Sequence, residues 1–528
     1  MKRSHACVVL CLFTCLVLSS AAQVAVTTYQ NDNYRSGTNT QETTLTLNNV
    51  NASQFGRKAV FNVTGYVYAQ PLYVPNVNIN GTLHNVVYIA TEHDQVYAFD
   101  VNSGQQLWSK NLLISSGALI QVNPISSNDV YCTDVVPEIG ITGTPVIDVA
   151  NHEMFLIANT KEYNAVTQTT TFFQTIYALD IRTGGLRTPP QRVTGTFPGT
   201  GQGSQNGLLT FDPLLEGQRA SMMLLNGKVY GAWSSHCDIV PYHGWLIGFD
   251  ELTLTRTGIF VDTPNGNEGG FWGSGSGPAA DSAGSIYVAS GNGDYDANSD
   301  YGDSVMRLIP AAQSITLADY FAPWDQLTLD MDDTDVGSGG ITLLPDQPGS
   351  QYPHLLVQAG KEGTIDLINR DNMGHFHPGN DDQIVQTLPF IIGPLFGGPA
   401  FWNNNAYFGG ANDHLKAFTY NRQTQLLSTG PASQSPETFS FPGPTPAISS
   451  NGTSNGIVWI VETDNYGGGL AVLRAYDATN LANELYNSQQ NPSRDSPGDA
   501  VKFVVPTIAD GHVFVAAENQ VSMYGLLQ

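Results

Sequence analysis

The chain has 528 residues, with 46 Asp and Glu against 21 Lys and Arg, so its formal net charge at pH 7 is −25. This acidic balance and the absence of a basic patch exclude nucleic acid as a partner, because binding to phosphates needs clustered cations. Only 13% of the residues are charged and 54 are glycine, which suits many short strands joined by tight turns.

The first 23 residues have the pattern of a secretory signal peptide. Lys2 and Arg3 precede an apolar run over residues 6–18, and small residues follow up to a cleavage zone near residues 21–23. No later stretch is apolar for 18 residues, so no membrane span is expected. The sequence therefore predicts a secreted protein, extracellular or, in a bacterium, periplasmic.

A strand phrase recurs along nearly all of the remaining chain. Each copy alternates apolar and small residues at period two, and most end in a turn rich in Asp, Asn, Thr and Gly. The eight copies are VYAFDVNSGQQLW (96–108), IYALDIRTGG (176–185), LIGFDELT (246–253), VMRLIP (305–310), IDLINRDNMG (365–374), LKAFTYNRQ (415–423), LRAYDATN (473–480) and VSMYGLL (521–527).

Repetition of one strand unit with loops of variable length predicts an all-β fold, an eight-bladed β-propeller of four-stranded antiparallel blades. Residues 24–528 would form this single domain, whereas a large β-sandwich would not explain eight similar phrases. Residues 24–29 are expected to pair with the last blade, because a closed ring leaves no free edge strand. Equivalent strands should end near Asp100, Asp180, Asp250, Ile309, Asn369, Thr419, Asp477 and Gly525.

Only two cysteines remain once the signal peptide is removed. Cys132 and Cys237 are an even pair in an oxidising compartment, so a disulfide is predicted, with Cα atoms about 4.4–6.8 Å apart. Four Asn-x-Ser/Thr triplets would be glycosylated in a eukaryotic host, which makes a glycoprotein the expectation there. They begin at Asn51, Asn62, Asn80 and Asn451.

The start of the mature chain resembles a known family. The segments TTYQNDNYRSGTN (27–39), AQPLYV (69–74), VVYIAT (86–91) and VYAFDVNSGQQLW resemble the quinoprotein alcohol dehydrogenase-like propellers, also called PQQ-like repeat proteins. That family binds pyrroloquinoline quinone (PQQ) beside calcium. The resemblance covers essentially the whole mature chain, but it is more specific for the fold than for the chemistry, because related propellers act as scaffolds.

The resemblance assigns roles to several residues. Lys361 would contact a quinone carbonyl and stabilise negative charge on it. Asp335 would be both the catalytic base and a metal ligand, and Asp238 and Asn292 would complete the calcium site. A structural interpretation also exists for each: Lys361 in a blade turn, Asp335 in a solvated acidic loop, and Asn292 in a left-handed turn.

The resemblance also indicates where the quinone would rest. Ser234 and Ser235 would hold its carboxylates, and Trp272 would be its aromatic floor. Trp272 lies three residues too far from Asp281, so counting without a gap places Gly275 there, and packing between blades is an alternative role for the tryptophan.

Two features depart from the family. Its pair of adjacent cysteines would fall at Cys132 and Thr133, where only one is present. Glu138 stands where the family has an arginine for a quinone carboxylate. A carboxylate there would face the cavity and disfavour a tricarboxylate ligand.

Two functions follow from these residues. The first is a secreted PQQ- and calcium-dependent oxidoreductase acting on an alcohol or sugar hydroxyl. Its electrons would leave through a separate acceptor, because no Cys-x-x-Cys-His motif for covalent haem is present. The second is a non-catalytic extracellular propeller that binds a glycan or a protein through its loops.

Overall fold

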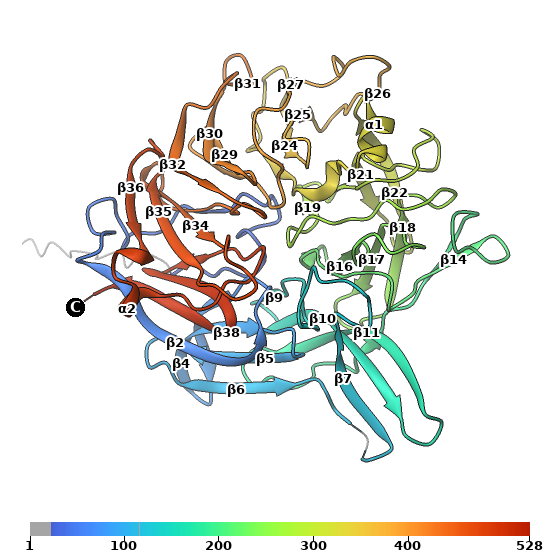
Figure 1. Cartoon of the computed structure of the whole chain (residues 1–528), viewed down its shortest axis with the longest axis horizontal. Helices are drawn as coiled ribbons and strands as arrows, with labels where there is room; N and C mark the ends of the chain where they lie inside the picture. Colours follow the sequence, from blue (N-terminus) through green and yellow to red (C-terminus); the bar gives the residue numbers. More distant parts are fainter. Residues whose placement is uncertain (1–22, 116, 528) are drawn as a thin grey trace, which may run out of the picture.

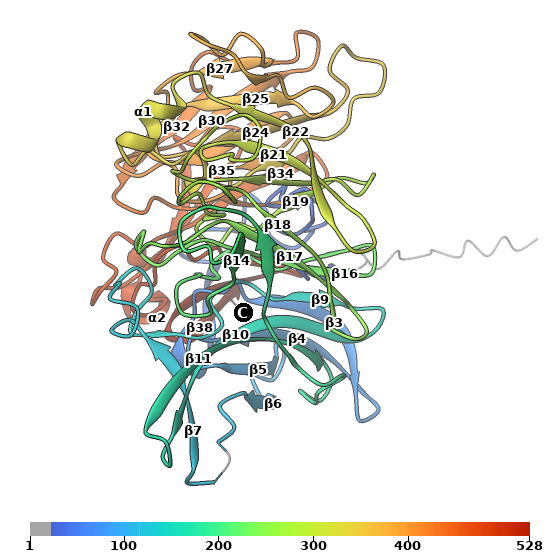
Figure 2. The same cartoon turned by 90° about the vertical axis from the view of Figure 1, so that its right-hand side faces the viewer.

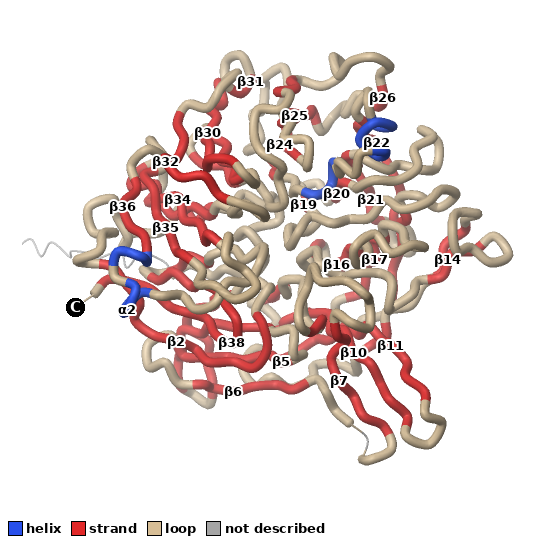
Figure 3. The backbone as a smooth tube through the Cα atoms, viewed as in Figure 1, coloured by secondary structure: helices blue, strands red, loops and turns tan. Residues whose placement is uncertain are grey.

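The computed structural model of the protein describes residues 23–115 and 117–527. The predicted signal peptide, apart from Gln23, lies outside these residues. The described chain consists almost entirely of strands and loops (Figure 3), and its sheets follow one another round a ring in chain order (Figure 1).

The first half of the ring is built from consecutive antiparallel strands. The first sheet comprises β3 (Leu72–Ile79), β4 (Thr82–Ala90), β5 (Gln95–Asp100) and β6 (Gln106–Asn111). The second comprises β7 (Ile120–Ser126), β8 (Glu138–Ile139), β9 (Val146–Asp148), β10 (Glu153–Asn164), β11 (Thr169–Asp180) and β12 (Gln191–Arg192). The hairpin β13 (Thr196–Pro198) and β14 (Leu208–Thr210) precedes the third, which comprises β15 (Met223–Leu225), β16 (Lys228–Trp233), β17 (Trp245–Asp250) and β18 (Arg256–Val261).

The next sheets are also built mainly from consecutive antiparallel strands, and β26, which comes later in the chain, adds to the first of them in parallel with β22. One comprises β19 (Ala279–Ala280), β20 (Ile286–Ala289), β21 (Val305–Pro310), β22 (Ile315–Ala322) and β26 (His375–Phe376). The next comprises β23 (Thr342–Leu343), β24 (Leu355–Ala359), β25 (Ile365–Asn369) and β27 (Gln386–Leu388). It is followed by β28 (Ala400–Trp402), β29 (Asn405–Gly409), β30 (Asp413–Asn421), β31 (Leu426–Leu427) and β32 (Ser433–Phe439).

The last two sheets include strands from the start of the chain. One comprises β1 (Thr38–Asn39), β33 (Ala447–Asn451), β34 (Ser454–Glu462), β35 (Val472–Asp477) and β36 (Glu484–Asn487). The other comprises β2 (Phe55–Tyr66), β37 (Thr507–Ala509) and β38 (His512–Leu526). The described helices are short: α1 (Gln326–Met331), α2 (Pro492–Asp495), and the 3-10 turns η1 (Val336–Ser338) and η2 (Ser488–Gln490).

Each predicted repeat phrase forms a strand of a different sheet, namely β5, β11, β17, β21, β25, β30, β35 and β38. The aspartates that end several of them explain why these strands stop. A carboxylate oxygen of Asp100 accepts from the Ser103 amide at 2.7 Å, and one of Asp250 accepts from the Thr253 amide at 2.9 Å. In such a turn the Asp side chain bonds to a backbone amide a few residues later in the chain. Because the interaction is local, the end of each strand can be recognised from the sequence.

The strand that completes the last sheet is β2, not residues 24–29, so the prediction for that segment is wrong. β2 pairs antiparallel with β38 from Phe55 opposite Leu526 to Tyr66 opposite Glu518. Val26 instead bridges Tyr73 in β3, with backbone N–O distances of 2.8 and 2.9 Å. β2 has 12 residues, long enough to cover the edge of β38, whereas the chain after Val26 turns sharply at Gln30, where φ is 49°.

The segment from Thr27 to β1 links the first strands of successive sheets. Arg35 is fully buried within it and donates to Pro278 O at 3.0 Å, Tyr29 O at 2.9 Å and Thr28 Oγ1 at 2.8 Å. Its burial lowers the pKa of the guanidinium to about 10. Backbone carbonyls of the segment accept from Ile147, Ala280, Leu343 and Phe401, each on a different sheet.

The core lies between neighbouring sheets. Trp233, Trp245 and Trp459 are among the largest fully buried side chains, and Phe211 packs edge-on against the first two at 5.4 and 5.7 Å. Beyond this core, β7, β10 and β11 reach out past the rest of the molecule (Figures 1 and 2). Within the described residues, no helix has the length and apolar character needed to cross a membrane.

Candidate functional site

Side chains from distant parts of the chain line one cavity of about 280 Å³. Asp238, Trp272, Asp335 and Lys361, four of the residues singled out in the sequence, are among them. Its volume is close to the lower end for small-molecule sites. The complete lining is Asp134, Arg219, Asp238, Trp272, Ser274, Asp335, Ser338, Lys361, Phe396, Phe441 and Phe503.

Lys361 and Asp335 form an ion pair in this cavity. The ammonium Nζ lies 2.5 Å from Asp335 Oδ2 and 2.6 Å from Asp333 Oδ1. Although burial opposes the charge of Lys361, the carboxylates of Asp335 and Asp333 raise its pKa above the ordinary value. The cation therefore stays protonated, and Asp333, which the sequence did not single out, is part of the charged group.

The backbone around Asp335 fixes its carboxylate. Oδ1 accepts from the Asn292 amide N–H at 2.9 Å, and the Asp335 carbonyl accepts from the Lys361 amide at 2.9 Å. A Cβ at Gly291 would lie 2.2 Å from Asp335 Oδ1 and 2.7 Å from the Trp272 ring. Gly291 thus allows the acid and the indole to approach the same stretch of backbone.

Asn292 has an oxygen that the protein leaves without a partner. Its Nδ2 donates to Asp333 Oδ1 at 2.8 Å, while its buried Oδ1 makes no hydrogen bond. Asp238 accepts from the Tyr242 hydroxyl at 2.9 Å. Partial desolvation and the negative charges of Asp335 and Asp333 raise the pKa of Asp238. Amide and carboxylate oxygens of this kind are suitable ligands for a hard cation.

Among the described residues, Cys132, Asp134 and Cys237 are the one group of three acidic, His or Cys side chains whose potential ligand atoms all lie within 4.8 Å of one another. Its two sulfurs are bonded to each other, so this group is not a metal site. A cation held by Asp238 and Asp335 would therefore depend on the Asn292 amide oxygen as well as on the two carboxylates.

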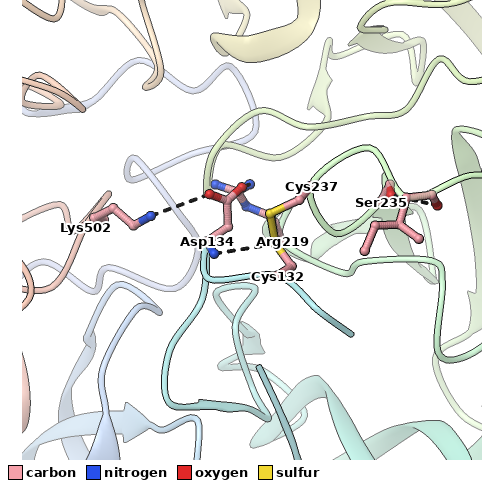
Figure 4. The surroundings of a disulfide bond; sticks show 7 residues. Cys132, Asp134, Arg219, Ser235, Cys237 and Lys502 are labelled. Carbon is pink, nitrogen blue, oxygen red and sulfur yellow. Dashed lines mark hydrogen bonds and ion pairs between the residues drawn. A yellow bond between two sulfur atoms is a disulfide. The ribbon is translucent and has the colours of Figure 1, made fainter. Parts of the chain in front are cut away.

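The cavity also has a cationic side that the sequence did not reveal. Arg219 Nη1 lies 3.2 Å and Lys502 Nζ 3.6 Å from the two carboxylate oxygens of Asp134 (Figure 4). The Arg219 guanidinium also lies 4.8 Å from the centre of the Phe503 ring and 5.9 Å from that of Trp272. Neither cation belongs to a recognisable motif, so no sequence signal points to them.

Glu138 lies elsewhere. It is in β8, its Oε2 is 2.8 Å from His93 Nδ1, and it is not among the residues that line the cavity. The charge at this position therefore does not oppose an anionic ligand in the cavity. The cations on that side are Arg219 and Lys502.

Trp272 forms part of an aromatic wall. It is 7% exposed, its Nε1 donates to Gly269 O at 3.1 Å, and its ring meets Tyr242 edge-on at 6.0 Å. Ser234 and Ser235 are fully buried and do not line the cavity. Ser235 Oγ donates to Ile239 O at 3.4 Å, whereas Ser234 Oγ has no partner. Two other serines, Ser274 and Ser338, are in the lining.

The predicted disulfide is confirmed. Cys132 and Cys237 are joined by an S–S bond of 2.08 Å, with Cα atoms 5.6 Å apart (Figure 4). Asp134 and Asp238, which follow the two cysteines closely, both line the cavity. The bond therefore ties together two loops that form its wall.

Comparisons with known proteins agree with the fold. No family model and no curated protein matches the sequence. The structure is similar to quinohemoprotein alcohol dehydrogenase from Comamonas testosteroni (TM-score 0.61, 12% identity, 96% of this chain and 81% of that chain). It is also similar to quinohemoprotein alcohol dehydrogenase ADHIIG from Pseudomonas putida HK5 (0.60, 13%, 95% and 80%) and to BamB from Moraxella catarrhalis (0.50, 11%, 89% and 99%).

In fold, the chain resembles the quinohemoprotein alcohol dehydrogenases. The predicted β-propeller of mainly antiparallel sheets is thereby confirmed, and three of the sheets in the described chain have four strands. At these identities the similarity concerns the fold alone. Two of the three similar structures are named as alcohol dehydrogenases and the third is not named as an enzyme, so the function must be argued from the cavity.

Proposed function

We propose that this protein is a secreted PQQ- and calcium-dependent oxidoreductase that acts on an alcohol or sugar hydroxyl. Residues 24–528 would form one eight-bladed propeller, a count supported by the eight sheets of three or more strands in the described chain. The observation that carries the proposal is the meeting of Asp238, Trp272, Asp335 and Lys361 at one cavity. These residues are spread over positions 238–361, and the family resemblance selected them from the sequence alone.

The cavity suits a flat anionic quinone. Trp272 and three phenylalanines provide aromatic surface, and Arg219 and Lys361 are the cations of the lining. The three carboxylates of the lining outnumber them, so a bound calcium ion would have to offset this negative charge for an anionic quinone. Lys502, which is 5% exposed, adds a cation beside Asp134. Ser234 and Ser235 would hold carboxylates only indirectly, from behind the lining, so Arg219 is the more direct candidate for that role.

Calcium would be held by Asp335, Asp238 and the Asn292 amide oxygen. The unpartnered, buried Asn292 Oδ1 supports this assignment, because an unsatisfied buried acceptor costs free energy that a ligand recovers. When bound, PQQ would supply the two-electron acceptor and calcium the Lewis acid for the oxidation.

The chain's own contribution would be proton transfer and charge placement. Asp335 Oδ1 is occupied by the Asn292 amide, which leaves Oδ2 to take the hydroxyl proton of the substrate. Lys361 contacts that same oxygen. Its ammonium would have to turn toward the quinone to stabilise negative charge there and release Oδ2 as base. Phe396, Phe441 and Phe503 would restrict water at the reacting atoms.

The test is reconstitution of the purified protein with PQQ and calcium. We expect a bound-quinone absorbance and reduction of an artificial electron-acceptor dye with some members of a panel of alcohols and sugars. Asp335→Asn should lower kcat by roughly 10²–10⁴-fold. Asp371→Asn is the matched control, because the Asp371 side chain is 48% exposed, pairs with His354 and is not among the residues that line the cavity. Full activity in Asp335→Asn, or no quinone binding in the wild type, would overturn the proposal.

The second candidate is a non-catalytic extracellular propeller that binds a glycan or a protein. The observation that favours it is the ion pair between Lys361 and Asp335, which ties the proposed base to the proposed quinone contact. Aromatic rings beside carboxylates also suit a carbohydrate. Binding of glycans in an array by protein that neither binds PQQ nor reduces the dye would support this function.

A further inference from the structure

A turn outside the cavity lining concentrates buried oxygens that have no partner among the described residues. It joins β4 to β5 and contains Thr91, Glu92 and Asp94, all of which are 0% exposed. Thr91 Oγ1, Glu92 Oε1 and both carboxylate oxygens of Asp94 make no hydrogen bond. Burying a carboxylate without a partner costs several kcal/mol, so three unpartnered carboxylate oxygens and one hydroxyl within four residues require an explanation.

The two acids converge on one neighbouring residue, Gly140. Glu92 Oε2 accepts from the Gly140 amide at 2.7 Å and from Thr142 Oγ1 at 2.9 Å. A Cβ at Gly140 would lie 2.9 Å from Asp94 Oδ1 and 2.2 Å from the Glu92 carbonyl oxygen. The Ile141 amide donates to Thr91 O at 3.3 Å, so the backbone of this segment is held against the turn.

The protein supplies no cation to these acids. Neither Glu92 nor Asp94 forms an ion pair among residues 23–115 and 117–527, and the nearby His93 ring is bonded to Glu138. Burial, followed by the charges of Glu92 and Glu138, raises the pKa of Asp94 well above its ordinary value, and the nearby Asn159 amide, which donates to Gly140 O, offsets this only in part. Burial also raises the pKa of Glu92 to about 8. Ionised carboxylates at this position thus need a positive charge from outside the chain.

We propose that the turn between β4 and β5 binds a hard divalent cation, for which calcium is the best chemical fit. Its ligands would be both oxygens of Asp94, Glu92 Oε1 and Thr91 Oγ1, which are all oxygens, as calcium requires. Two carboxylates match a double positive charge. Calcium takes about six to eight oxygens, so backbone carbonyls or water would complete its shell, whereas magnesium demands a near-ideal octahedron and usually retains several waters.

The position of this site gives it a role in shaping the candidate functional site. Gly140 ends the segment that carries Cys132 and Asp134, and Asp134 lines the cavity. A cation that holds the turn against Gly140 would anchor that segment at one end, while the disulfide anchors it at the other. The inference does not depend on PQQ or on catalysis.

The test counts calcium in purified full-length protein after removal of free metal, using mass spectrometry. If both sites bind, we expect two calcium ions in the wild type and one in either Asp94→Asn or Asp335→Asn. Asp366→Asn is the matched control, since Asp366 is a buried aspartate (6% exposed) outside both sites. If the wild type holds a single calcium ion, which is lost in Asp94→Asn but kept in Asp335→Asn, this site would be supported and the calcium of the proposed function would be refuted. An unchanged count in Asp94→Asn would overturn the inference.

A second measurement covers the case in which Asp94→Asn does not fold. In Asp335→Asn protein, calcium should raise Tm, and a chelator should reverse the increase. Crystals of the wild type soaked in terbium should then show an anomalous peak beside Asp94. Ordered water at that position, with no peak and no response of Tm to calcium, would mean that the acids are neutral and hydrated, and the site would be refuted.

Discussion

Removal of the disulfide between Cys132 and Cys237 tests how the cavity wall is held. The bond closes a loop with a sequence separation of 105. In the chain-entropy model, a loop of about 100 residues stabilises the folded state by about 4.7 kcal/mol at 25 °C. With an unfolding entropy of about 2.1 cal/mol/K per residue, a chain of roughly 500 residues has a slope near 1 kcal/mol/K, so Tm should fall by about 4–5 °C.

The measurement is calorimetry of Cys132→Ser/Cys237→Ser beside the wild type, with the wild type under reducing conditions as the matched control. Both should show the same decrease in Tm. PQQ affinity should fall as well, because Asp134 and Asp238 line the cavity beside the two cysteines. A decrease below about 1 °C in both proteins would refute the loop-entropy reasoning. Labelling of free thiols in the native wild type would refute the bond itself.

Three further predictions concern the cavity and the core. Gly291→Ala should destabilise the fold by roughly 1–3 kcal/mol and weaken PQQ binding, because the new Cβ would lie 2.2 Å from a carboxylate oxygen of Asp335. Gly430→Ala is the control: its new Cβ would have no atom within 4 Å, so neither the denaturant midpoint nor the affinity for PQQ should change. Arg219→Ala should weaken PQQ binding by roughly 10–100-fold in an absorbance titration, and Arg219→Lys should weaken it less. If Arg219→Ala bound PQQ as tightly as the wild type, the role of the guanidinium would be contradicted. Burial and three neighbouring acids raise the pKa of Asp366 to about 8. The folded state therefore holds its proton more tightly than the unfolded state, and stability should fall as pH rises from about 4 to 8, by roughly 6 kcal/mol at most. Asp366→Asn should flatten that decrease in urea titrations, and an unchanged pH profile would contradict the assignment.

The sequence by itself determined the repeat and its turns. Period-two alternation and the aspartates at the strand ends act through near neighbours, as the bond from the Ser103 amide to Asp100 shows. The disulfide also followed from the sequence, because two cysteines remained in an oxidising compartment. The closing strand did not, since β2 and residues 24–29 both precede the first sheet, and only length and register against β38 decide between them.

The tertiary structure alone decided which charges meet in the cavity. The resemblance pointed to Lys361 and Asp335. Arg219, which lines the cavity, and Lys502, which lies behind it, stand in segments with no motif and come together only at Asp134. The sequence could not show that Glu138 faces His93 and not the cavity, because a short shift along one strand changes the direction of a side chain. Local pattern is set by adjacent residues, whereas a site in a ring of sheets depends on contacts between residues hundreds of positions apart.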